Sequence, residues 1–108
     1  MPTAAVPLLD PAQLKRQTRG IASLQIEVLS LFVAEVERLM RQVEDAPDPQ
    51  VRADRLRALI GVARNIGATL IAQEARTLET EIAAETPDLS PLKNAISETL
   101  AYIRRTGG

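Results

Sequence analysis

Helix-start signals divide this chain at three places. Asp10-Pro11, Asp48-Pro49 and Ser90-Pro91 each put a side-chain oxygen directly before a proline. The oxygen accepts from the free N–H groups of a first helical turn, and a proline there loses no helical hydrogen bond. A chain interrupted in this way is expected to fold as helices joined by short turns.

The segments between these signals carry apolar residues three and four positions apart, as amphipathic helices do. We expect a short helix over about residues 11–19 ending near Gly20, then longer helices over about 21–44, 49–64, 68–84 and from residue 90 onward. Asn65 and Gly67 mark the break between the third and fourth helices. The expected buried residues are Leu24, Val28, Leu31, Phe32, Leu39 and Val43, then Leu56, Leu59, Ala63 and Ile66, then Ile71, Ala75, Leu78 and Ile82, and finally Leu92, Ile96, Thr99 or Leu100, and Ile103.

The composition agrees with an all-α fold. Hydrophobic residues make up 45% of the 108 residues, yet there is one Phe, one Tyr and no Trp. A core of Leu, Ile, Val and Ala suits close-packed helices better than a β-sandwich. Short connections favour antiparallel neighbours, which predicts an up-down-up-down antiparallel four-helix bundle with a short extra N-terminal helix. We expect one domain over residues 10–106, after a flexible lead-in of residues 1–9.

The residue types that are missing narrow the chemistry. The chain has no His and no Cys, so zinc, haem and most transition-metal sites lose their usual ligands, and we expect no cofactor and no metal. No catalytic motif is present, which indicates a protein that is not an enzyme. The net charge is -1, and the basic group Arg52, Arg55, Arg57 and Arg64 is interrupted by Asp54, so we expect no nucleic-acid partner. Without a signal peptide or an apolar run of about 20 residues, a cytoplasmic, soluble protein with no membrane partner is expected.

A glycine stands in the middle of the third expected helix. Gly61 follows Arg57 by four residues and precedes Arg64 by three, so the three share one helix face. Gln50 and Asp54 extend this face, and we call these five residues the glycine stripe. Glycine inside a helix costs about 1 kcal/mol relative to alanine, so the position invites an explanation.

Residues 56–68, LRALIGVARNIGA, resemble the signature of histidine-containing phosphotransfer (HPt) domains, which reads roughly A-H-x-L-K-G-S-A-x-x-I-G-A. The matching residues are Leu59, Gly61, Ala63, Ile66, Gly67 and Ala68. Arg57 stands at the phospho-accepting histidine, Ile60 at the lysine and Val62 at the small polar residue. The resemblance extends over nearly the whole chain and implies the same helical-bundle architecture. It also implies partners of two kinds, a response-regulator receiver domain or a histidine kinase.

Arginine cannot perform the chemistry that the resemblance implies. Phosphoryl acceptance needs a nitrogen lone pair near neutral pH, whereas a guanidinium stays protonated and has no acceptor lone pair. The sequence therefore predicts a non-catalytic, pseudo-HPt protein that binds its partner without accepting a phosphoryl group. The expected partner-binding residues are Asp54, Arg57, Ile60, Gly61 and Arg64. In this interpretation Arg57 reaches the acidic pocket of a receiver domain as a bidentate donor.

Alternative interpretations remain at each position. Gly61 is equally well explained by close packing of a neighbouring helix or as a relic under no selection, and Arg57 by a solvated charge paired with Asp54. Ile60 turns either inward or outward to form an apolar patch, and residues 65–68 are interpreted as a helix junction. The alternative for the whole chain is a structural or dimerisation module that is no longer tied to phosphorelay signalling. Under the main prediction the protein is expected to be a monomer or a weak homodimer.

Overall fold

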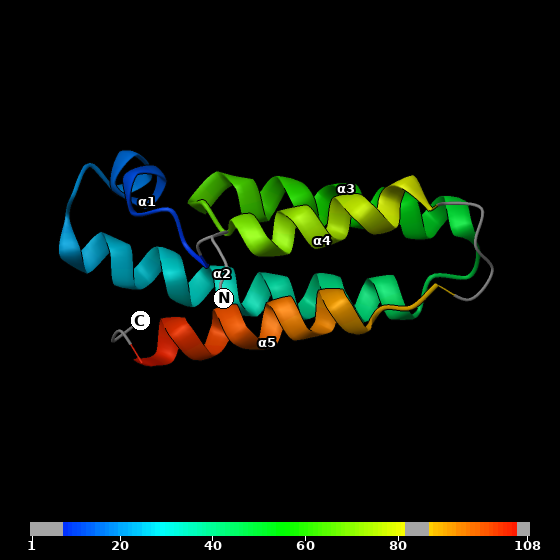
Figure 1. The fold of residues 1–108 in the computed structure, drawn as a ribbon. Coiled ribbons are helices and arrows are strands. Elements are labelled where there is room, and N and C mark those ends of the chain that lie inside the picture. The colour runs from blue at the N-terminus through cyan, green and yellow to red at the C-terminus, as the bar shows by residue number, and fades with distance from the viewer. Residues whose placement is uncertain (1–7, 82–86, 106–108) are drawn as a thin grey trace.

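Helices account for most of the chain. The computed structural model of the protein describes residues 8–81 and 87–105, and within these ranges it contains no strand. The helices are α1 (Pro11–Thr18), α2 (Ala22–Glu44), α3 (Pro49–Ile66), α4 (Thr69–Thr80) and α5 (Ser90–Arg105) (Figure 1). The all-α prediction is confirmed.

The helix starts follow from the predicted caps. The Asp10 carboxylate accepts from the Ala12 N–H at 3.0 Å, and the Asp48 carboxylate accepts from the Val51 N–H at 2.9 Å. At α5 the cap differs from the prediction, because the Ser90 N–H donates to the Asp88 carboxylate at 3.0 Å. This bond lowers the pKa of Asp88. Each acidic side chain satisfies an N–H group that lacks a partner within the first helical turn.

The junction between α3 and α4 differs from the prediction by two residues. Asn65 does not break the helix, because α3 continues to Ile66 and ends at Gly67, whose φ is 81°. The Ala68 N–H donates to the Ala63 carbonyl at 2.8 Å and the Gly67 N–H to the Arg64 carbonyl at 3.3 Å. This is a Schellman motif, in which a glycine in the left-handed region closes the helix. α4 ends at Thr80, and Ile82 and Ala84, which we expected in it, lie outside the described residues.

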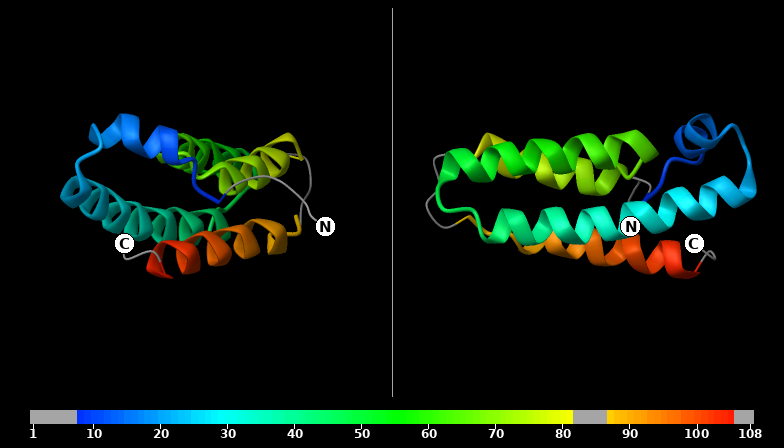
Figure 2. Two further views of the ribbon diagram at one scale, coloured as in Figure 1. Left: turned by 60° about the vertical axis from the view of Figure 1, so that its left-hand side comes forward. Right: turned by 180° about the vertical axis from the view of Figure 1, so that it is seen from behind.

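The four long helices lie lengthwise along one another and reverse direction from one to the next (Figures 1 and 2). α3 contacts α2 and α4, and α5 contacts α4 and α2. The short α1 contacts α2 and α3, and lies beside the N-terminal end of α2. Each long helix therefore has a partner on two sides, with the core between them.

Most of the expected core residues are buried. In the described part of α3, α4 and α5 every residue expected to be buried is buried, including Thr99 and Leu100. In α2 the expected Leu24 and Val28 are only half-buried, and the expectation is wrong at Leu31, whose side chain is 66% exposed. The buried face of α2 is instead made by Leu29, Phe32, Val36, Leu39, Met40 and Val43. Leu31 lies about 100° around the helix from Phe32, so it falls outside the buried face of α2.

The residue that directly precedes Asp10 is also buried. Leu9, which we placed in the lead-in, packs into the core, whereas residues 1–7 of that lead-in are outside the described residues.

Two buried hydroxyls are satisfied within their helices, since Thr18 donates to the Leu14 carbonyl and Thr99 to the Ala95 carbonyl, both at 2.8 Å. None of the described helices combines the length and the apolar character that crossing a bilayer requires.

Candidate partner-binding surface

The glycine stripe lies on the solvent side of α3. All five of its residues, Gln50, Asp54, Arg57, Gly61 and Arg64, are exposed, as the helical spacing predicted. The opposite side of the helix carries Leu56, Leu59 and Ala63, which are 1%, 0% and 0% exposed. Burial of that side fixes the rotation of α3 and so presents the stripe outward.

Ile60 does not belong to this surface. Its side chain is 8% exposed and packs in the core, although we expected it among the partner-binding residues. The inward alternative is the correct one, because Ile60 lies one turn from Leu56 and from Ala63 on the buried side. The candidate surface therefore loses the apolar patch that an outward Ile60 would have provided.

Gly61 is not needed for helix packing. A Cβ built at this position would meet no atom of the described residues within 4 Å, apart from its chain neighbours and its own helix backbone. The close approach of a neighbouring helix is thereby ruled out as the reason for glycine at this position. A bare stretch of helix backbone faces outward instead.

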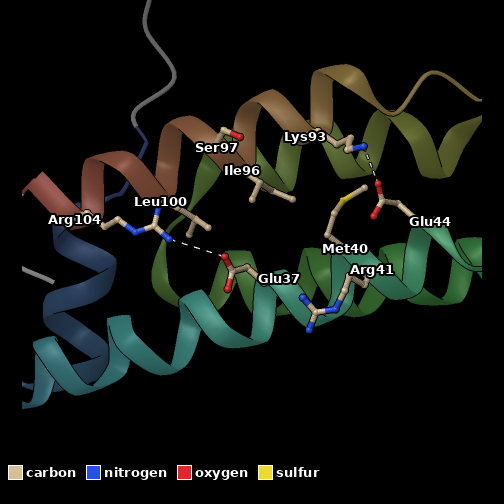
Figure 3. A pocket seen from close by; sticks show the side chains of 9 residues that line it. All are labelled: Glu37, Met40, Arg41, Glu44, Lys93, Ile96, Ser97, Leu100 and Arg104. Carbon is tan, nitrogen blue, oxygen red and sulfur yellow. Dashed lines mark ion pairs between the residues drawn. The ribbon is translucent and has the colours of Figure 1, made fainter.

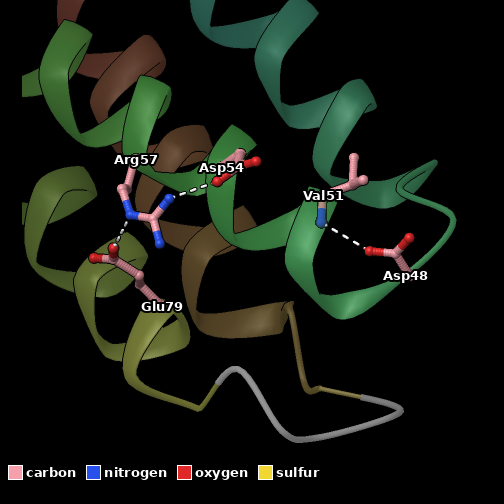
Figure 4. A network of polar contacts seen from close by, with 5 residues as sticks. All are labelled: Asp48, Val51, Asp54, Arg57 and Glu79. Atoms are coloured by element: carbon pink, nitrogen blue, oxygen red, sulfur yellow. Dashed lines mark hydrogen bonds and ion pairs between the residues drawn. The ribbon is translucent and has the colours of Figure 1, made fainter.

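Arg57 is held by two carboxylates (Figure 4). Its Nη1 donates to Asp54 at 2.6 Å, within α3, and its Nε donates to Glu79 of α4 at 2.7 Å. The hydrogen bond to Asp54, and next the one to Glu79, raise the pKa of Arg57. The pair with Asp54 was expected, whereas the pair with Glu79 was not. Arg57 therefore spans the seam between α3 and α4 and does not extend freely into solvent.

A signal for the second ion pair was present in the sequence. Arg57 lies ten residues before Gly67 and Glu79 twelve residues after it. In an antiparallel helix pair that reverses at Gly67, residues at similar distances from the turn lie at the same level. Predicting the ion pair between Arg57 and Glu79 therefore required the position of the turn, which the sequence marked only to within a few residues.

Arg64 and Arg76 lie beside a shallow hollow between α3 and α4. The hollow has a volume of about 370 Å³ and is lined by Arg64, Thr69, Ala72, Gln73 and Arg76. Neither arginine forms an ion pair or a side-chain hydrogen bond with any of the described residues. Arg76 and Gln73 were not singled out in the sequence, because they belong to a different helix from the stripe.

The other arginines of α3 do not share this surface. Arg52 is 9% exposed, and the Arg55 guanidinium donates to the Gln42 carbonyl of α2 at 2.7 Å. The basic group that looked contiguous in sequence therefore divides among different environments. Of these four arginines, Arg64 is the exposed one whose guanidinium has no partner among the described residues.

A larger hollow, of about 440 Å³, lies between α2 and α5 (Figure 3). Ion pairs cross it, Lys93 with Glu44 at 2.7 Å and Arg104 with Glu37 at 3.9 Å. Met40, Ile96 and Leu100 line it between these pairs. Most of the charged side chains that line this hollow therefore pair with one another, whereas the two arginines beside the hollow between α3 and α4 have no ion-pair partner among the described residues.

No group of three or more His, Cys, Asp or Glu side chains within residues 8–81 and 87–105 is placed to hold a metal ion. Comparison with protein-family models, with curated proteins and with solved structures finds no match to the chain. The surface around Gly61 therefore has to be interpreted from its own geometry.

Proposed function

We propose that this chain is a non-catalytic, pseudo-HPt protein, which binds a receiver domain or a histidine kinase without accepting a phosphoryl group. The order of helix contacts supports it. α2, α3, α4 and α5 pair in sequence and α5 returns to α2, as an up-down-up-down four-helix bundle requires. The short α1 agrees with the extra N-terminal helix that the sequence predicted.

The observation that carries the proposal is the open glycine at position 61. A glycine that costs helix stability and that no neighbouring helix requires is best explained by an approach from outside the molecule. In the HPt signature the corresponding glycine leaves room for the partner beside the reacting residue. Here the residue one turn earlier is Arg57, and it is exposed on the same face.

The chemistry of the site agrees with binding and not with transfer. Arg57 has no free lone pair, and its two carboxylate partners favour its protonated form further. The chain has no histidine that could replace it. A docking surface without a phosphoryl acceptor would compete with catalytic HPt proteins for a receiver, or would hold a receiver in place.

Chemical-shift mapping tests this proposal directly. The labelled protein is titrated with receiver domains from its own genome, each with and without a phosphate mimic, and then with kinase domains. We expect amide shifts centred on Arg57, Gly61 and Arg64. Shifts centred on a different face, or silence across the complete panel, would refute the proposal.

Two variants of one residue make the test specific. Gly61→Arg places a long side chain in the open space and should abolish binding. Gly61→Ala adds only a methyl group, which meets none of the described residues in the free protein, and should weaken binding far less than Gly61→Arg. Both variants replace the glycine, which disfavours the helix, with a residue that favours it. A difference in binding between them therefore reports obstruction of the surface and not a change in helix stability.

A specific observation also favours the alternative, a dimerisation module. Leu31 is 66% exposed and lies at the edge of a hollow of about 340 Å³ whose lining includes Val28, Phe32 and Val62. Burial of such a leucine against a second copy would be favourable. Sedimentation equilibrium of the wild type and of Leu31→Gln distinguishes the two functions. A dimer that Leu31→Gln weakens and Gly61→Arg does not would support the alternative.

A further inference from the structure

The positive charge of the surface around Gly61 is not where the sequence placed it. Arg57 lies between Asp54 and Glu79 at 2.6 and 2.7 Å, so its charge is met within the fold. A partner that drew Arg57 outward would have to break two charge-assisted hydrogen bonds and leave two carboxylates facing its own acidic groups. Arg57 is therefore poorly suited to contact an acidic partner.

Arg64 and Arg76 are suited to that contact. They come from α3 and α4, line one hollow and have no ion-pair partner within the described residues. Glu74 lies two positions before Arg76 on α4 without forming an ion pair with it, and Glu79, three positions on, is already engaged by Arg57. The exposed Gln73 amide lies at the same hollow and adds an uncharged donor.

The open backbone lies next to this pair. Gly61 precedes Arg64 by three residues on the same helix face, so a partner that rests on the bare backbone lies about one helical turn from the Arg64 side of the hollow. Ala72, 8% exposed, is a small residue in the lining of the hollow. Small residues here keep the two guanidiniums accessible from outside.

We propose that Arg64 and Arg76 form the part of the docking surface that contacts anions, and that they bind the carboxylates of a receiver domain's acidic pocket. Arg57 stays in its ion pairs with Asp54 and Glu79 and links α3 to α4. This inference rests on the proposed function. Planar guanidiniums bind carboxylates through paired N–H donors, which favours a carboxylate-lined pocket as the occupant. Two arginines with no aromatic residue lining the hollow are too few for a nucleic-acid backbone.

Affinity measurements with a receiver domain that binds the wild type separate the roles of the three arginines. The double variant Arg64→Gln with Arg76→Gln should bind about tenfold more weakly or worse and should lose most of the salt dependence of binding. Arg57→Gln should stay within about threefold of the wild type, since its charge does not reach the partner.

A charge-matched control completes the design. Arg41 and Arg105 are exposed on α2 and α5 and have no ion-pair partner within the described ranges, so Arg41→Gln with Arg105→Gln removes the same net charge elsewhere. It should bind like the wild type. A control that weakens binding as much as the double variant would overturn the inference, because the effect would then come from net charge alone.

The two proposals fail in different ways. If the wild type binds a receiver and the Arg64 and Arg76 variant binds equally well, the inference is wrong and the proposed function stands. The same holds if Arg57→Gln loses as much affinity as the double variant. If only a kinase domain binds the wild type, the inference is wrong and the proposed function stands. If neither a receiver nor a kinase domain binds it, both are wrong.

Discussion

Gly61 and Gly67 lie six residues apart, one inside α3 and one directly after it, and the fold treats them differently. At Gly67 the backbone has φ 81°, and a Cβ would lie 2.7 Å from the Asp10 Cβ and 3.1 Å from its nitrogen. At Gly61 the helix is regular and a Cβ would meet nothing. Both glycines match the HPt signature, so sequence alone gives them equal weight.

The surroundings of Gly67 explain the difference. The Asp10 N–H donates to the Gly67 carbonyl at 2.8 Å, and the Gln13 amide donates to the Asn65 carbonyl at 3.0 Å. The start of α1 thus covers the end of α3 and satisfies carbonyls that the helix leaves unpaired. The backbone conformation and the packing against α1 require a glycine at position 67. At position 61 a glycine lowers helix stability, and no contact within the described residues requires it. Such a residue is a better guide to function than one that packing already explains.

The largest effect is expected at the junction. Gly67→Ala should lower the free energy of unfolding by about 2–4 kcal/mol, because alanine is strained in the left-handed region and its Cβ would collide with α1. Urea denaturation measures the loss. Gly20→Ala is the matched control, since Gly20 also has a positive φ, 73°, but only the Lys15 side chain lies near, at 3.7 Å. Equal losses at both positions would show that the contact with α1 adds nothing.

A smaller effect is expected from Asp10, the residue that Gly67 meets. Asp10→Ala removes the cap of α1 and should lower the free energy of unfolding by about 1 kcal/mol. Because the two residues touch, the losses of Asp10→Ala and Gly67→Ala should not add. A double-mutant cycle that gives simple additivity would separate α1 docking from the strain at Gly67.

The opposite sign is expected at Gly61. Gly61→Ala should raise the free energy of unfolding by about 0.5–1 kcal/mol, since alanine favours the helix and its methyl group has free space. The same denaturation experiment tests it. A destabilised Gly61→Ala variant would mean that this glycine, like Gly67, is required by the fold, and the contrast between them would disappear.

The smallest effect is expected at Arg57, one turn before Gly61. Arg57→Gln should lower the melting temperature only slightly, because both of its ion pairs are half-exposed and screened by solvent. The ion pairs themselves are checked by the Arg57 Nε–H resonance, which should exchange with solvent more slowly than that of Arg105. Equal exchange rates would argue against the ion pairs through which Arg57 links α3 to α4.

Much of the fold was accessible from the sequence because its signals are local. Asp10-Pro11 and Asp48-Pro49 start helices through bonds that span two or three residues. The buried sides of α3 and α5 follow from spacings of three and four residues within one helix. The prediction was wrong at Leu31, where several apolar residues surround the helix and only the packed neighbours decide which face is buried.

The sequence by itself determined the helical class, the starts of α1 and α3 and the outward direction of the glycine stripe, since caps and periodicity act within one helix. It also excluded phosphoryl transfer to a histidine, because the absence of a residue type is read directly from the sequence. Only the tertiary structure decided that Ile60 is buried, that Gly61 faces open space and that Glu79 holds Arg57. It alone brought Arg64 and Arg76 to one hollow. These facts depend on how α3 lies against its neighbouring helices, and that register is set by packing between segments far apart in the chain.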